Sequence, residues 1–460
     1  MKTKSRAHVR AFTSSSWYRV AGLAAILAAA PGARAQTADR LDSLVHRAMA
    51  VNSTVRSAEA RVEAARERVS PAASWPDPML MLGVMNVPVG GMVSPAHGAP
   101  AGSDPMRMNV VGIQQTVPFP GKLSLARRAA EARLAEAEAE LARVRLDVEA
   151  RVRRAYYDVA FRGRALEVVA RNAEVLASLI AASEARYAAA GGSQVEVLNT
   201  RVEATRLSET AAEQTEARLA ALARLNALLE QSSDTPLSAD FPPALIAIAA
   251  PASASRASFV STAFGARAAG SPLKAIDELQ HLARSSSPVL LRQRAVVEAE
   301  RARAELAARE FLPDVTASLE YGQRADLPDM VSARISLPLP VFKRWKQDAL
   351  TAAARAEVAA AKAEVAAAEQ QVFGRIAELH AGIERQRTFL ALYVGALIPQ
   401  TQATVQASLA GFQAGRTSLF EVLGHQAALF RYETEYFSAL ANFAGDVAEL
   451  ERTVGAEVLR

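Results

Sequence analysis

The chain has 460 residues, of which half are hydrophobic and 22% are charged, and it contains no cysteine. The lack of cysteine excludes disulfide bonds, thiolate metal sites and lipid attachment to a cysteine. The formal net charge is +5, but six of the 53 basic residues lie in the first 35 positions, which hold no acidic residue. The remaining 47 basic and 48 acidic residues give no indication of nucleic-acid binding.

The first 35 residues have the pattern of a secretion signal. A basic leader is followed by the apolar run 20–30 and by a small-x-small cleavage site at 33–35. We therefore expect residues 1–35 to be a signal peptide and the mature chain to begin at Gln36. Beyond it, no apolar run approaches the roughly 20 residues of a membrane-spanning helix, which leaves a periplasmic protein or a membrane β-barrel.

The mature chain contains two copies of one plan. Three matches occur in the same order in both halves: Pro76-Asp77 with Pro313-Asp314, Val117-Pro118-Phe119-Pro120 with Leu337-Pro338-Leu339-Pro340, and Val195-Glu196-Val197-Leu198 with Phe420-Glu421-Val422-Leu423. We predict a first repeat at 36–231 and a second at 273–460, each with a helix, two strands and a long helical hairpin. The Ser/Pro-rich segment 232–272 is expected to be an irregular linker outside the helices.

Two Ala-rich segments, 122–189 and 343–413, predict very long helices, and shorter helices are expected at 52–70 and 288–310. The long segments carry a seam that steps by alternate fours and threes, as in a left-handed coiled coil. The seam positions are Ala130, Leu134, Ala137, Leu141, Val144, Val148, Arg151 and Ala155, and then Val372, Ile376, Leu379, Ile383, Gln386, Leu390, Tyr393 and Leu397. Such helices would be roughly 100 Å long and need neighbours along their whole length, which favours a cylinder of helices.

Two segments of the second repeat, 315–324 and 331–337, alternate apolar and polar residues and are joined by a short polar turn with Pro328 and Asp329. This alternation is typical of transmembrane strands and equally of a soluble hairpin with one buried face. With two strands in each repeat, one chain cannot close a barrel. Three chains would supply twelve strands and remove every exposed edge.

Methionine is concentrated in one stretch, because six of the nine lie between positions 79 and 108. Alignment of the first strand with the third puts its leucines and valine on the lipid-facing side and its methionines in the lumen. The candidate metal ligands are then Met79, Met81, Met85 and, if the second strand extends that far, Met106 and Met108. Thioether sulfur suits Cu(I) and Ag(I). The alternative is that methionine fills a partly apolar surface.

The signal peptide, the tandem helix–strand–strand–helix–helix plan and the Tyr/Phe…Gly…Ser…hydrophobic-Glu-Val-Leu turns together resemble the TolC-like outer-membrane efflux family. The resemblance covers nearly all of residues 40–458. It implies a mostly α fold with a membrane β-barrel contribution: four transmembrane strands and two long coiled-coil hairpins per protomer. Three protomers would build a 12-stranded barrel and a 12-helix α-barrel that extends into the periplasm.

The resemblance further implies a channel subunit of a tripartite efflux system rather than an enzyme. Its partners would be a periplasmic adaptor, an inner-membrane pump of the resistance-nodulation-division type and outer-membrane lipid. The stretch Trp75-Pro76-Asp77-Pro78 resembles the heavy-metal branch. No P-loop, HExxH motif or cofactor site is apparent. Drug efflux, type I secretion and a periplasmic scaffold or adaptor remain alternatives, although an adaptor would have one hairpin between β-rich halves.

The same resemblance places the two helix-to-helix turns at the periplasmic tip, where the adaptor docks. The turn residues are Gly191, Gly192 and Ser193, and Gly415, Arg416, Thr417 and Ser418. Glycine before a hydroxyl residue is also what any helix end followed by an N-cap requires. Acidic residues one and two turns before the aromatic residue close the tip in some family members. Here Gln406 and Leu409 stand six and three places before Phe412, and only Glu184 is acidic at the corresponding sites before Tyr187. We therefore expect a gate of neutral polar or apolar residues.

Overall fold

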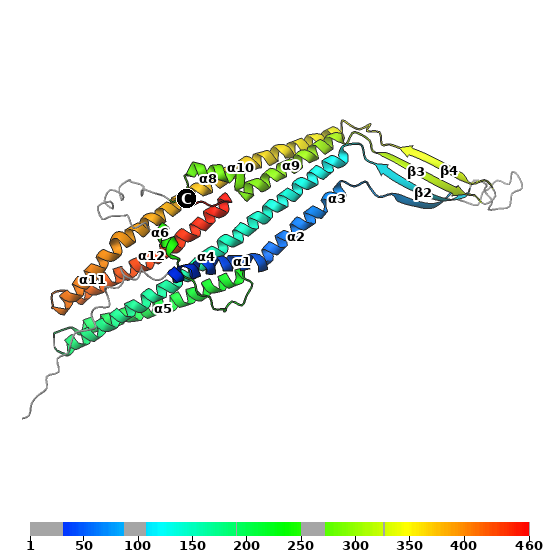
Figure 1. The fold of residues 1–460 in the computed structure, drawn as a ribbon. Coiled ribbons are helices and arrows are strands. Elements are labelled where there is room, and N and C mark those ends of the chain that lie inside the picture. Colours follow the sequence, from blue (N-terminus) through cyan, green and yellow to red (C-terminus); the bar gives the residue numbers. More distant parts are fainter. Residues whose placement is uncertain (1–30, 87–106, 190, 250–271, 325–326, 460) are drawn as a thin grey trace, which may run out of the picture.

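The computed structural model describes residues 31–86, 107–189, 191–249, 272–324 and 327–459. Most of the predicted signal peptide, residues 1–30, lies outside these ranges. The molecule is elongated, with a long helical bundle and a sheet that extends from one end (Figure 1). The helices are α1 (Pro31–Val51), α2 (Ser53–Glu67), α3 (Val69–Ala72), α4 (Lys122–Ala188), α5 (Gln194–Leu228), α6 (Pro243–Ala249), α8 (Ile276–Ser286), α9 (Pro288–Arg309), α10 (Gln347–Leu392), α11 (Ile398–Gln413) and α12 (Leu419–Val454). The strands are β1 (Met79–Met85), β2 (Met108–Val117), β3 (Val315–Gln323) and β4 (Met330–Ser336).

The internal repeat is confirmed in the order of the elements. The first copy runs from α2 through β1, β2 and α4 to α5, and the second runs from α9 through β3 and β4 to α10, α11 and α12. Beside the sheet, α2 packs against α4, α4 against α9, and α9 against α10, which repeats the order of the strands. Further from the sheet, α4 packs between α5 and α12. The predicted domain boundaries themselves stay a prediction.

The first long helix forms as predicted, because α4 has 67 residues and is therefore roughly 100 Å long. The second differs in two ways. It begins at Gln347 instead of position 343, after a series of turns, and a π-helical turn at Tyr393–Leu397 separates α10 from α11. Pro399 lies just beyond that turn and lacks the N–H that would continue the helical ladder. The wider turn absorbs this break.

The core lies where the long helices meet in the middle of the bundle. The predicted seam of α10 is buried at Ile376, Ile383 and Leu390. The predicted seam of α4 is wrong at Arg151, whose side chain is 65% exposed. The buried stripe passes instead through Val152 and Tyr156, because the 3.6-residue period of a straight helix drifts away from a strict heptad.

The linker prediction is also partly wrong. Residues 243–249 form the short helix α6, and Phe241 is buried inside the bundle. The Phe241 ring stacks between Tyr157 of α4, at 5.9 Å between ring centres, and Phe437 of α12, at 6.3 Å. The segment therefore fastens these two helices to each other, in addition to connecting the repeats.

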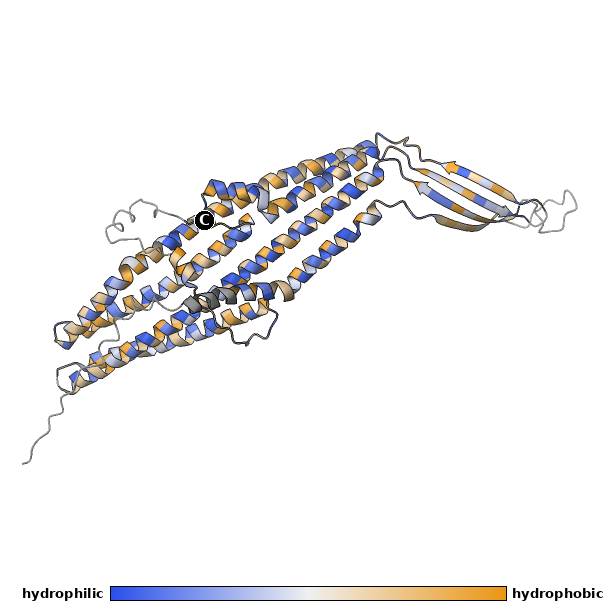
Figure 2. Ribbon diagram, in the orientation of Figure 1, coloured by the Kyte–Doolittle hydropathy of each residue, from blue (hydrophilic) through white to orange (hydrophobic). Residues whose placement is uncertain are grey.

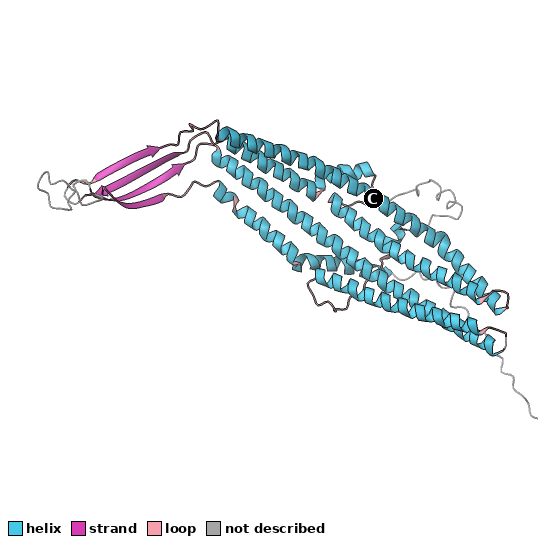
Figure 3. Ribbon diagram, turned by 180° about the vertical axis from the view of Figure 1, so that it is seen from behind, coloured by secondary structure: helices cyan, strands magenta, loops and turns pink. Residues whose placement is uncertain are grey.

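The sheet is antiparallel with the strand order β1-β2-β3-β4, so its two edges are β1 and β4 (Figure 3). The paired segments of β3 and β4 agree with the predicted alternating segments to within about one residue at each end. Figure 2 shows polar and apolar residues mixed along the helices. Among the residues that the structure describes, no helix combines the length and the apolar character needed to cross a membrane.

Candidate functional site

The strand register assigns every described side chain of the sheet to one of two faces, because residues paired across neighbouring strands point the same way. One face, called here the methionine–polar face, holds Met79, Met81, Gly83, Met85, Met108, Val110, Gly112, Gln114, Thr116, Thr316, Ser318, Glu320, Gly322, Met330, Ser332, Arg334 and Ser336. The other, the apolar face, holds Leu80, Leu82, Val84, Val111, Ile113, Val117, Val315, Ala317, Leu319, Tyr321, Val331, Ala333 and Ile335, together with the polar residues Asn109, Gln115 and Gln323. The apolar face is largely exposed in a single chain.

Two glycines of the methionine–polar face make room for long neighbouring side chains. A Cβ at position 112 would lie 2.8 Å from Cγ of Glu320 and 3.2 Å from Cε of Met81. A Cβ at Gly322 would lie 2.7 Å from Sδ of Met108. These side chains therefore lie across the glycines, close to the sheet surface. Glu320 is buried there and forms an ion pair of 3.2 Å with Arg334.

The predicted grouping of methionines is found in the structure. Met79, Met81, Met85 and Met108 share one face, whereas Met106 lies outside the described residues. Sequence reasoning missed Met330, which pairs with Gly322 on the same face. The alternation in 331–337 could have found it, because position 330 continues the polar half of that pattern. No group of three His, Asp or Glu side chains suited to a metal ion occurs in the described ranges.

A polar contact joins the two repeats where the sheet meets the helices. The Asp314 carboxylate accepts a hydrogen bond from the Phe119 backbone N–H at 2.8 Å and from the Lys122 ammonium at 2.9 Å. The Lys122 side chain is only 9% exposed, and the Asp314 carboxylate offsets the cost of burying the ammonium group. Burial alone raises the pKa of the Asp314 carboxyl, but the Phe119 amide and the Lys122 ammonium together hold that pKa below its usual value.

The two tip turns have different geometries. Gly415 has a φ of +69°, and the N–H of Arg416 donates to the carbonyl of Gly411 at 2.8 Å. Ser418 and Glu421 then form a capping box that starts α12. Thr417 packs over Gly411, where a Cβ would collide with the threonine hydroxyl. Only Gly415 needs glycine for its backbone conformation in this second turn.

In the first turn, Ser193 caps α5 by accepting a hydrogen bond from the Val195 N–H at 3.2 Å. The close approach is at Gly192, where a Cβ would lie 3.2 Å from Cβ of Arg186 and from the Tyr187 nitrogen. A Cβ at Gly191 would lie 3.8 Å from its nearest neighbour, the carbonyl oxygen of Arg186. Gly191 therefore has room for a Cβ, whereas Gly415 has the left-handed backbone conformation that favours glycine. The role of both residues in adaptor docking stays a prediction.

One side chain that sequence reasoning missed joins the two tips. The Arg186 guanidinium donates to the Phe412 carbonyl at 3.0 Å and to the Gly191 carbonyl at 3.2 Å. It also lies 4.5 Å from the centre of the Phe412 ring. A single basic residue at a helix end gives no sequence signal that would separate this role from ordinary helix capping. Glu184, in the same turn region, forms an ion pair of 2.7 Å with Arg201. The composition of the closed gate stays a prediction.

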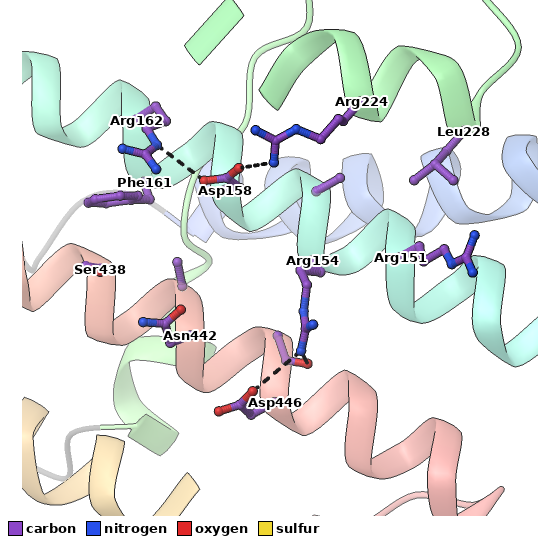
Figure 4. A pocket seen from close by; sticks show the side chains of 13 residues that line it. Arg151, Arg154, Asp158, Phe161, Arg162, Arg224, Leu228, Ser438, Asn442 and Asp446 are labelled. Atoms are coloured by element: carbon purple, nitrogen blue, oxygen red, sulfur yellow. Dashed lines mark hydrogen bonds and ion pairs between the residues drawn. The ribbon is translucent and has the colours of Figure 1, made fainter. Parts of the chain in front are cut away.

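A groove of about 660 Å³ lies between α4, α5 and α12 (Figure 4). Asp158 in this groove is paired with Arg162 at 3.4 Å and with Arg224 at 3.2 Å. Asp446 faces Arg154 at 3.5 Å, and burial raises the pKa of the Asp446 carboxyl. Both carboxylates that line the groove are thus held by arginines, an arrangement that stabilises helix packing.

A family model described as "Outer membrane efflux protein" matches residues 44–231 and 279–456. The chain belongs to the outer membrane efflux protein family. The curated relative CzcC of Cupriavidus metallidurans, named a cobalt-zinc-cadmium resistance protein, is 23% identical over 338 residues, which cover 73% of this chain and 74% of CzcC.

Solved structures of outer-membrane channels share the fold. OprN matches with a TM-score of 0.74 and 17% identity over 90% of each chain. CusC matches with a TM-score of 0.74 and 16% identity over 91% of this chain and 92% of CusC. VceC from Vibrio cholerae matches with a TM-score of 0.72 and 18% identity over 91% of this chain and 96% of VceC.

These matches confirm the predicted family and fold class. The protein is an efflux channel subunit of the outer membrane, its helices extend into the periplasm, and its sheet is the part that contributes to the barrel. The family is one of transport proteins. The scaffold or adaptor alternative is excluded, because the chain has two helical hairpins and matches the channel family along both repeats.

Proposed function

We propose that this channel subunit conducts heavy-metal cations, and that its methionine–polar face favours soft ions such as Cu(I) and Ag(I). The observation that carries the proposal is the placement of Met79, Met81, Met85, Met108 and Met330 on the polar side of the sheet. Methionine that served only as an apolar filler would also be expected on the apolar face. Every methionine of the described strands lies instead among threonine, serine, glutamine, glutamate and arginine.

The side chains of the methionine–polar face are better suited to passing metal ions along than to holding them tightly. Thioether sulfur binds soft ions, and several weak sites in a row let an ion enter and leave. Met81 lies beside Glu320 around Gly112, and Met85 is paired with Met108. An ion would therefore find successive thioethers along the strand direction, with a carboxylate nearby that is already neutralised by Arg334.

The assembly that fits this role is a homotrimer with a periplasmic adaptor and an inner-membrane pump of the resistance-nodulation-division type. The open edges at β1 and β4 support the trimer, because three such sheets would close a barrel of twelve strands. The adaptor would dock at the two tip turns, Gly191 to Ser193 and Gly415 to Ser418. Their position at the end of the bundle opposite the sheet supports this assignment (Figure 1).

The relative CzcC favours a second substrate group, because its name specifies cobalt, zinc and cadmium. These divalent ions depend less on thioether ligands than Cu(I) does. The two groups can therefore be separated by removing the thioethers. Drug efflux and type I secretion stay alternatives, and neither has a need for soft donor atoms.

The test replaces Met79, Met81, Met85, Met108 and Met330 with leucine, which nearly conserves volume and should cost little stability. A strain lacking the chain is complemented with the parent or the variant at matched expression, and its tolerance to copper, silver, cobalt, zinc, cadmium and a dye panel is measured. We expect the variant to lose copper and silver tolerance only. The control, Leu80→Met with Leu82→Met, changes the apolar face and should have no effect.

Unchanged copper and silver tolerance in the leucine variant would overturn the soft-ion proposal. If the parent chain restores tolerance to cobalt, zinc and cadmium alone, the substrates of this channel are the ions that the name of CzcC specifies. Rescue of dye tolerance alone would assign drug efflux and exclude metal transport.

A further inference from the structure

The contact between the two repeats within one chain provides a template for a contact between chains. In the template, the segment that follows β2 reaches the residue that precedes β3: Asp314 binds the Phe119 N–H and the Lys122 ammonium. The neighbouring strands β2 and β3 pair directly, and Thr116 and Thr316 are hydrogen-bonded through their hydroxyls at 3.1 Å.

Because of the internal repeat, the segments that make this contact occur a second time in the chain, before β1 and after β4. Pro76-Asp77 before β1 corresponds to Pro313-Asp314 before β3, and Leu337-Pro338-Leu339-Pro340 after β4 corresponds to Val117-Pro118-Phe119-Pro120 after β2. Lys343 is the first basic residue after Pro340, as Lys122 is after Pro120. Within one chain these parts cannot meet, because β1 and β4 are at opposite edges of the sheet.

The segments before β1 and after β4 are exposed, whereas the corresponding segments before β3 and after β2 pack against each other. Asp77 is exposed, and in the described part of the chain neither its carboxylate nor the Leu339 N–H has a hydrogen-bonding partner. The segment after β4 also exposes large apolar side chains, namely Leu339, Val341, Phe342 and Trp345. In the first repeat the corresponding Phe119 is half-buried and Lys122 is buried.

We propose that the edge formed by β4 and residues 337–346 docks on the edge formed by Trp75 and β1 of a second copy of this chain. Asp77 of one subunit accepts a hydrogen bond from the Leu339 N–H of the next subunit and pairs with its Lys343. The proposal rests on the trimer proposed above and deepens it by naming the residues that join the subunits.

A second copy is the occupant that fits best, for three reasons. The template is built from the same sequence pattern, so the complementary surface already exists on this chain. The charges are complementary, since Asp77 would meet Lys343, Arg344 and Lys346. Each chain offers one edge of each kind, so head-to-tail contacts can close into a ring and cover both open edges.

The same correspondence gives the register across the junction. Thr116 corresponds to Ser336 and Thr316 to Met79, so Ser336 of one subunit should pair with Met79 of the next. Val110 and Gly322 correspond to Met330 and Met85, which places these two methionines opposite each other. The methionine–polar face would then continue from one subunit to the next.

Cysteine cross-linking tests this junction, because the native chain contains no cysteine. The full chain with Ser336→Cys and Met79→Cys is oxidised in isolated outer membranes and examined on a non-reducing denaturing gel. We expect a covalently closed trimer that reducing agent returns to monomers. Each single-cysteine variant, and the pair Ser336→Cys with Leu82→Cys on the other face, should remain monomeric.

The ion pair is tested in the same cross-linking background by charge exchange. Asp77→Lys should abolish the trimer band, and addition of Lys343→Asp should restore it. If the variant with Ser336→Cys and Met79→Cys reaches the outer membrane but gives only monomers on the gel, the proposal is overturned. It is also overturned if Lys343→Asp does not restore the trimer band that Asp77→Lys removes. Cross-linking does not depend on substrate, so failed metal tolerance with an intact trimer band would refute only the metal proposal.

Discussion

The Arg186 guanidinium at the end of α4 lies over the Phe412 ring at the end of α11 and donates to the Phe412 carbonyl. The guanidinium adds a second hydrogen bond to a helix-end carbonyl that already accepts from the Gly415 N–H at 3.0 Å, and it also gains a cation–π contact. The first tip turn is thus held against the second within one subunit, and the guanidinium reaches Gly191 as well.

Arg186→Gln should loosen the two tips without unfolding the bundle. We expect a local loss of about 1 kcal/mol, measured as faster amide hydrogen exchange at residues 186–193 and 411–418 with unchanged exchange in β1 to β4. Arg201→Gln is the control, since its exposed ion pair with Glu184 contributes little. Equal exchange in both variants would show that the contact with Phe412 does not hold the tips.

Gly191 and Gly415, one from each tip turn, should tolerate substitution very differently. Gly415→Val forces a β-branched residue to a φ of +69°, which should cost about 1–2 kcal/mol, whereas Gly191→Ala should change thermal stability by less than about 0.5 kcal/mol. The measurement is the melting temperature of each purified variant, together with efflux in cells. A large loss at Gly191 and none at Gly415 would contradict the turn geometry.

The contact around Asp314 should make stability depend on pH in the acid range. The folded pKa of Asp314 is lowered, so the folded state holds this proton less tightly than the unfolded state. The stabilisation is present above the unfolded pKa of about 3.9 and is lost as pH falls through the folded pKa. Melting temperatures between pH 6 and pH 3 should fall more steeply for the parent than for Asp314→Asn. Parallel curves would contradict this.

Phe241→Ala tests the role of the segment between the repeats. The ring is buried between Tyr157 and Phe437, so its removal should cost about 3 kcal/mol through lost burial and a cavity. The measurement is urea unfolding in detergent, with Leu237→Ala, in a half-buried position of the same segment, as the milder control. An irregular linker outside the bundle would tolerate both substitutions equally.

The periodicity of apolar residues in the sequence was sufficient to predict most helices and strands, and which side chains of the strands share a face. The alternation of apolar and polar residues at 315–324 and 331–337 predicted two strands. Alignment of the two repeats then placed Met79, Met81 and Met85 on one face of the sheet and Leu80 and Leu82 on the other. Contacts between elements distant in the chain were not predictable. Nothing local to Phe241 or Arg186 indicates which helix it will touch, and a heptad pattern alone did not show that the stripe of α4 passes through Val152.

In the assembled channel, the methionine–polar face should line the conduit and the apolar face should contact lipid. Met81→Cys and Leu82→Cys, neighbours on opposite faces of β1, test it in intact cells with a charged, membrane-impermeant thiol reagent and with a lipid-soluble maleimide. We predict that Met81→Cys reacts rapidly with the charged reagent and that Leu82→Cys reacts with the maleimide alone. Rapid labelling of Leu82→Cys by the charged reagent, with Met81→Cys protected from it, would contradict the account.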